Sequence, residues 1–90
     1  MTHFLVSEEN PAGEKLEDLL TKIRADILRR CLKITEDHRP EAMKVLANNV
    51  AVLDHLTEAI RLATDSTVIL DRAFGPSQSE KGGAPRIGTA

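Results

Sequence analysis

Residues 20–53 read LTKIRADILRRCLKITEDHRPEAMKVLANNVAVL, and this stretch decides the fold. Apolar side chains recur every three or four residues on both sides of a short polar segment, residues 36–39. The repeating apolar residues before that segment are Leu16, Leu20, Ile23, Ile27, Cys31 and Ile34. At about 100° per residue these side chains fall within an arc of about 80°. The pattern predicts an amphipathic helix with one apolar face.

The first helix is predicted to start at residue 11. Asn10 is a good N-cap, because its side chain can accept a hydrogen bond from a free backbone N–H, and Pro11 suits the first helical position. Acidic residues follow near this end and basic residues gather toward the other end, as the helix dipole favours. We therefore expect a helix over residues 11–35, preceded by a flexible leader over residues 1–10.

A second helix is predicted over residues 40–74. Pro40 suits its first turn, and a glycine–proline pair follows its last residue. Its apolar stripe is broad and covers about 160° of the helix surface. Residues 64–67, TDST, form a poor helix interior, so a separate short third helix over residues 66–74 is an alternative.

The connection between the two helices, residues 36–39, is short, which makes them antiparallel neighbours. The sequence of 90 residues thus predicts an all-α helical hairpin, residues 11–74, as its domain. Residues 75–90 contain four of the five glycines and one large apolar residue, Ile87. Such a composition does not offset the entropy lost on ordering, so we expect a disordered tail.

Two helices of this length make a small core, and the single cysteine cannot form an internal disulfide. We therefore expect a homodimer in which two hairpins form a four-helix bundle. The apolar end of the second helix, residues 62–74, is expected to project beyond the first helix and to face either a second copy or another protein. The predicted interface residues are Leu16, Leu20, Ile23, Ile27, Leu46, Asn49, Leu53, Leu56, Ile60, Val68, Leu70 and Phe74.

Two features within this pattern are polar or reactive. Asn49 projects about 40° from Leu53 in the apolar stripe, and an amide in a helical interface can fix register by pairing with its symmetry mate. The alternative is that Asn49 marks a helix edge. Cys31 lies on the inner stripe of the first helix and is interpreted as a buried apolar filler.

Three cations share one face of the first helix. Lys22, Arg29 and Lys33 lie within about 40° of one another. They form the candidate patch for an anion or an acidic partner. The alternative is a solvated face on which charges pair four residues apart, as Asp18 and Lys22 would.

Composition argues against several classes of function. The two phenylalanines are the only aromatic side chains, and the net charge is −2, so neither base stacking nor long-range attraction to nucleic acid or anionic lipid is favoured. No signal peptide or apolar run long enough for a membrane span is present in the sequence, and we expect a cytoplasmic protein. No paired carboxylates, nucleophile–base pair or metal-ligand cluster can be assembled, so we expect no enzyme, cofactor or metal.

The function expected from these patterns is a non-enzymatic interaction module, an adaptor or regulator of a larger protein, that acts as a homodimer. Its partners would be a second copy and another protein, with nucleic acid and membrane disfavoured. One alternative is a nucleic-acid-associated regulator that uses the basic face of the first helix. Another is a small helical enzyme with a site at the dimer interface.

Overall fold

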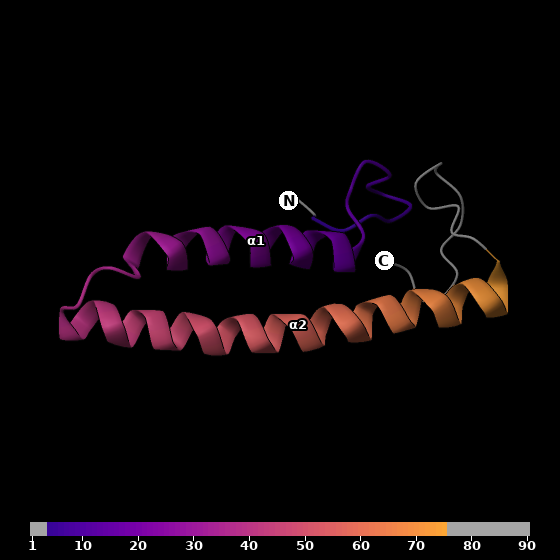
Figure 1. The fold of residues 1–90 in the computed structure, drawn as a ribbon. Coiled ribbons are helices and arrows are strands. Elements are labelled where there is room, and N and C mark those ends of the chain that lie inside the picture. Colours follow the sequence, from indigo (N-terminus) through magenta and orange to yellow (C-terminus); the bar gives the residue numbers. More distant parts are fainter. Residues whose placement is uncertain (1–3, 76–90) are drawn as a thin grey trace.

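The computed structural model describes residues 4–75 and shows two antiparallel helices joined by a short turn (Figure 1). Helix α1 spans Leu16–Ile34 and helix α2 spans Pro40–Phe74. The described residues contain no strand beyond two isolated bridges in the loop before α1. The all-α helical hairpin expected from the sequence is therefore confirmed. Residues 1–3 of the expected leader and residues 76–90 of the expected tail lie outside the described residues.

The predicted start of the first helix at residue 11 is wrong, because α1 begins five residues later, at Leu16. Asn10 does not cap a helix. Its backbone N–H donates to the Ser7 carbonyl at 3.1 Å, and its side-chain amide donates to the Leu5 carbonyl at 3.1 Å. Lys15 takes the N-cap position and makes no side-chain capping bond. The asparagine thus closes a turn in the preceding loop, a role that its short amide side chain fills equally well.

Residues 4–15 form a loop that folds back on itself before α1. The Val6 N–H donates to the Glu14 carbonyl at 2.9 Å, and the Glu14 N–H donates to the Phe4 carbonyl at 3.0 Å. Between these bonds the backbone of Gly13 approaches Leu5 so closely that a Cβ on Gly13 would lie 2.5 Å from the Leu5 carbonyl carbon. Only glycine fits at this position without moving the backbone of the loop.

We predict that Gly13→Ala lowers the free energy of unfolding by about 1–3 kcal/mol, the usual cost of forcing an extra methyl group into a packed site. Thermal unfolding followed by circular dichroism measures the change. Ala12→Ser is the control, since Ala12 is exposed beside Gly13. A thermal midpoint for Gly13→Ala equal to that of the control would show that the loop is not held in this conformation.

Helix α2 is continuous from Pro40 to Phe74, so the alternative of a separate third helix over residues 66–74 is wrong. Thr67, in the segment 64–67 where the helix was expected to be weakest, contacts both helices. Thr67 Oγ1 lies 3.2 Å from the Ala63 carbonyl oxygen and 2.7 Å from Glu17 Oε2 of α1. The helix ends at Phe74 and is capped by Gly75, whose φ of 78° favours glycine and whose N–H donates to the Asp71 carbonyl.

The two helices meet along one narrow seam, where half-buried residues alternate at spacings of three and four. Among residues 4–75 only Cys31 and Ala63 are buried, with exposed fractions of 5% and 9%. Cys31 is therefore the buried filler that the sequence predicts. The seam residues are Leu20, Ile27, Cys31 and Ile34 of α1 and Leu46, Asn49, Leu53, Leu56, Ile60, Ala63 and Leu70 of α2.

Beyond the start of α1, the loop takes over as the neighbour of α2. Leu5 and Val6 face Ala63 and Leu70 across a small cavity of about 260 Å³. The loop therefore covers part of the projecting end of α2. Phe74, one turn further, remains exposed.

Candidate interaction surfaces

The structure divides the predicted interface residues into two groups. Eight of them lie half-buried in the seam, where α1 and α2 of the same chain use them. These residues are Leu20, Ile27, Leu46, Asn49, Leu53, Leu56, Ile60 and Leu70. The other four, Leu16, Ile23, Val68 and Phe74, stay exposed. The residues available to a second chain are therefore those beside the seam rather than those within it.

One apolar surface lies beside the seam near the turn, and we name it the turn-end flank. It consists of Leu28, Leu32, Met43, Ala47 and Val50. On α2, its three residues line one side of an open pocket of about 580 Å³ together with Thr35. On α1, Leu28 lies seven residues before Thr35 and therefore on the same side of that helix. Leu32 is 66% exposed.

A second apolar surface lies on the opposite side of the seam, toward the open end of the hairpin, and we name it the open-end flank. It consists of Leu16, Ile23, Val52, Leu62 and Ile69. Leu16 and Ile23 are seven residues apart on α1, as Leu62 and Ile69 are on α2, so each pair shares one side of its helix. Ile69 is 57% exposed.

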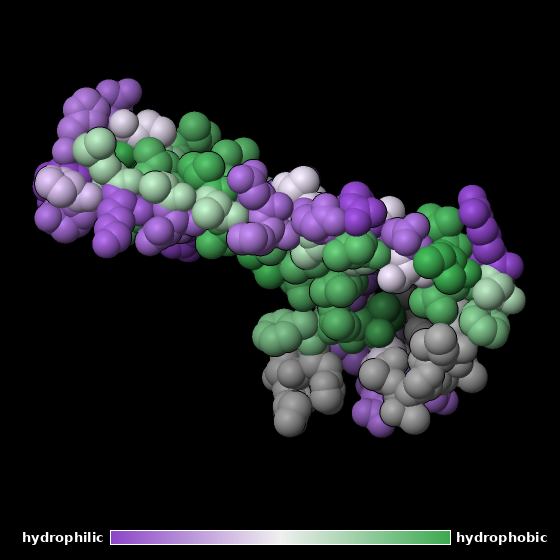
Figure 2. Space-filling view, turned by 90° about the horizontal axis from the view of Figure 1, so that it is seen from below, coloured by the Kyte–Doolittle hydropathy of each residue, from purple (hydrophilic) through white to green (hydrophobic). Residues whose placement is uncertain are grey.

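The space-filling view shows this diagonal arrangement from the side of α2 (Figure 2). In the half that contains the turn, hydrophobic side chains gather along the upper edge and hydrophilic ones along the lower edge. In the other half, hydrophobic side chains lie along the lower edge and hydrophilic ones along the upper edge. The hairpin therefore presents two separate apolar flanks on opposite sides.

A basic groove continues the edge of the open-end flank toward the turn. Arg29, Arg30 and Lys33 line it above Ile34, Val45 and Asn49, and it encloses about 510 Å³. Asp26 is its one acidic lining residue, and Asp26 Oδ2 lies 3.4 Å from Arg30 Nε. Among the described residues, Arg29 and Lys33 form no ion pair. Within the part of the chain that the structure describes, this groove therefore brings two unpaired cations together with Arg30.

The candidate patch of Lys22, Arg29 and Lys33 is divided by the structure. Arg29 and Lys33 line the basic groove, whereas Lys22 forms an ion pair with Glu14 of the loop. The hydrogen bond that Lys22 donates to Glu14 and the negative charge of Glu14 raise the pKa of Lys22. The sequence pattern missed Arg30, which lies on the same side as Ile23, one heptad later. It also missed the loop that brings Glu14 within reach of Lys22.

Two further ion pairs lie within α2 or just before it. Glu58 accepts hydrogen bonds from Arg61 one turn later, which lower the pKa of the Glu58 carboxyl. At the turn, Asp37 Oδ1 accepts hydrogen bonds from the backbone N–H and from Nε of Arg39, which lower the pKa of Asp37. The second of these pairs fixes the chain just before α2 begins. Such exposed pairs orient local backbone and contribute little to stability.

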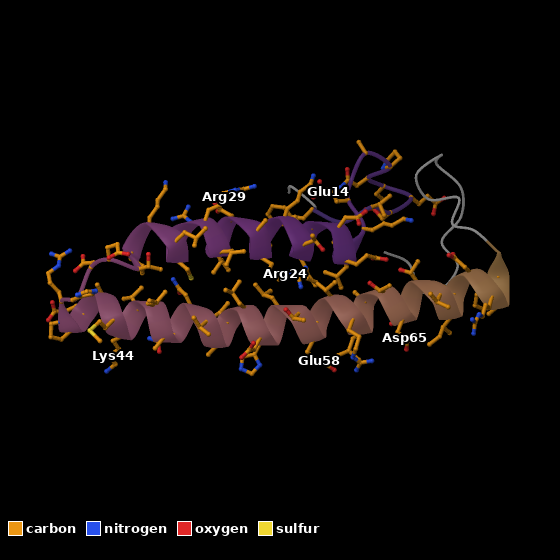
Figure 3. The ribbon with its side chains drawn as sticks, viewed as in Figure 1. Glu14, Arg24, Arg29, Lys44, Glu58 and Asp65 are labelled. Carbon is orange, nitrogen blue, oxygen red and sulfur yellow. The ribbon has the colours of Figure 1, made fainter. Side chains whose placement is uncertain are left out.

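Arg24 differs from the cations of the groove because it points into the space between the helices. Figure 3 shows Arg24 directed from α1 toward α2, while Arg29 lies on the outer side of α1. Arg24 Nη1 donates to Thr57 Oγ1 at 3.1 Å. Together with the contact between Glu17 and Thr67, this bond ties α1 to α2 at two points along the seam. Both contacts form only when α1 and α2 keep this alignment along the seam.

The described residues offer no set of three histidine, cysteine, aspartate or glutamate side chains placed to hold a metal ion. Neither helix among them is long and apolar enough to cross a membrane. Comparison with protein-family models, curated proteins and solved structures finds no match. The surfaces described above are therefore the basis for inferring a function.

Asn49 is a half-buried amide beside the groove, and its side chain makes no hydrogen bond within residues 4–75. We predict that Asn49→Leu raises the free energy of unfolding by about 1 kcal/mol, because an apolar side chain there gains burial without leaving an amide unpaired. Thermal unfolding measures the effect. The control is Asn48→Leu at the exposed neighbouring position, which should change the midpoint little. A marked loss of stability in Asn49→Leu would contradict this account of the seam.

Proposed function

We propose that this chain is a non-enzymatic interaction module, an adaptor or regulator of a larger protein, and that it acts as a homodimer in the cytoplasm. The observation that carries the proposal is the contrast between the seam and its surroundings. Cys31 and Ala63 are the only buried residues among residues 4–75, while both flanks expose large apolar side chains. Exposed apolar surfaces of this extent are typical of proteins that bind other proteins.

Stability supports association. A chain with fewer than about 70–80 ordered residues rarely gains enough stability from one apolar core without a disulfide, a metal or a partner. Here each helix packs against one other helix, so the residues beside the seam gain little from folding. Burying a flank against a second hairpin would supply that missing apolar contact.

We assign self-association to the turn-end flank, because a two-fold dimer places the same surface of each chain against itself. Leu28, Leu32 and Met43 would then pack against their symmetry mates. None of the five residues of the turn-end flank carries a charge. Two copies aligned with both turns at one end would therefore meet at this flank without a cluster of like charge. The product would be a four-helix bundle that leaves the open-end flank available.

The test is the molar mass in solution of the double variant Leu28→Glu/Met43→Glu. We expect the unaltered chain to have about twice the 9.9 kDa mass of one chain, and the double variant to fall to the single mass. The buried glutamates of each copy would lose hydration and repel those of the other.

The matched control is Leu62→Glu/Ile69→Glu, which places two charges on the open-end flank and should keep the mass of the dimer. A mass of one chain for the unaltered protein would contradict the homodimer. Dissociation by the control variant, with the turn-end variant still dimeric, would show that the dimer uses the other flank.

The basic groove favours one second candidate, a nucleic-acid-associated regulator. Its support is weaker, since the groove has three cations and an apolar floor, and the whole chain carries a net charge of −2. A nucleic-acid surface gains affinity mainly from many phosphate contacts. An enzyme with a site at the dimer interface has no specific observation in its favour.

A further inference from the structure

We propose that the basic groove and the open-end flank together bind one amphipathic helix of a partner protein, whose apolar residues lie on the flank and whose acidic residues lie over the groove. This inference rests on the proposed function and deepens it by naming the chemistry of the partner. Helices commonly bind in this way, with side chains at spacings of three, four and seven residues anchored along an apolar surface.

The groove and the flank are continuous along one edge of the hairpin. On α1, Leu16, Ile23 and Arg30 follow one another at intervals of seven residues. On α2, Val45 lines the groove and Val52 belongs to the flank, again seven residues apart. Side chains at this interval lie on the same side of a helix. A single straight helix of about 18–25 residues would therefore span both surfaces.

The edge of α2 that borders this surface carries no acidic side chain between Ala42 and Ala73. Its residues are Val45, Asn48, Val52, His55, Ala59, Leu62, Ser66 and Ile69. The acidic residues Glu58 and Asp65 lie on the far side of α2, where Figure 3 shows them pointing away from α1. An acidic segment of a partner would therefore meet the cations of α1 without repulsion from α2.

The groove has the composition expected for carboxylates attached to an apolar helix. Arg29 and Lys33 have no ion-pair partner among the described residues, and Arg30 contacts Asp26 only loosely. Below them, Ile34 and Val45 provide an apolar floor that can contact methylene groups of a partner. A phosphate backbone would use the cations but leave this floor without a contact. Charge complementarity and the floor together favour a peptide over nucleic acid.

A second copy of the chain fits this edge poorly. If two copies met here with their turns at the same end, Arg29, Arg30 and Lys33 of one copy would face those of the other. If they met in the opposite orientation, these cations would face Leu62 and Ile69. The first arrangement is repulsive, and the second desolvates charge without pairing it. This edge is therefore better suited to a different molecule.

The experiment uses a fluorescein-labelled peptide of about 22 residues. Leucines at i, i+3, i+7 and i+10 form an apolar face in one half, glutamates take the equivalent positions in the other half, and the remaining residues are alanine and glutamine. Fluorescence anisotropy with the full chain should give a dissociation constant in the micromolar range. Binding should weaken as salt rises from about 50 to about 500 mM, because the charges lie near the surface. A peptide with lysine in place of every glutamate should not bind.

The variant Arg29→Gln/Lys33→Gln should weaken binding of the acidic peptide by at least about tenfold, since both unpaired charges are lost. The control Lys44→Gln/Arg72→Gln removes the same charge from other exposed positions and should bind as the unaltered chain does. Circular dichroism establishes that all variants keep their helices.

Three results would overturn the inference: no binding of the acidic peptide, equal binding by the groove variant, or preferential binding of a 20-base-pair DNA duplex that the groove variant loses. The groove and flank belong to one chain, so this test is independent of the homodimer. The variant Leu28→Glu/Met43→Glu should bind the acidic peptide as tightly as the unaltered chain does. The same result is expected if the unaltered chain has the molar mass of a monomer.

Discussion

The structure depends on a geometric constraint: two helices that touch along a single line can bury only a narrow strip of each. The apolar stripe of α2 is wider than that strip, and α1 covers it only as far as Thr67. The loop before α1 adds cover at the end of the stripe through Leu5 and Val6. The apolar residues beside the seam then remain exposed, and association with other chains is the natural way to bury them.

Polar contacts decide how this narrow seam is aligned. Arg24 with Thr57, and Glu17 with Thr67, join the two helices at points ten residues apart on α2. Leucine and isoleucine contacts alone would tolerate a shift by one heptad, whereas these pairs would be lost by it. The alignment in turn places the basic groove and the open-end flank on one edge and the turn-end flank on the other. Register and surface organisation are therefore linked.

The hairpin could be predicted from the sequence because its periodicity and its short turn are local signals. The start of α1 could not, since the pair Asn10 and Pro11 suits a turn as well as a helix start, and the competing bonds to Leu5 and Ser7 involve a folded loop. The two flanks could not be predicted from the sequence either. An apolar stripe of about 160° includes the residues of the seam as well as residues on both sides of it. Only the position of α1 separates Leu46, which the seam uses, from Val50, which it leaves exposed.

The requirement for association is tested most directly by thermal unfolding of the unaltered chain at concentrations from about 2 to about 200 µM. If folding is coupled to association, mass action stabilises the native state as concentration rises, so the midpoint should increase by several degrees across this range. A midpoint independent of concentration, together with full helicity at the lowest concentration, would contradict the account. It would mean that the seam alone holds the two helices together.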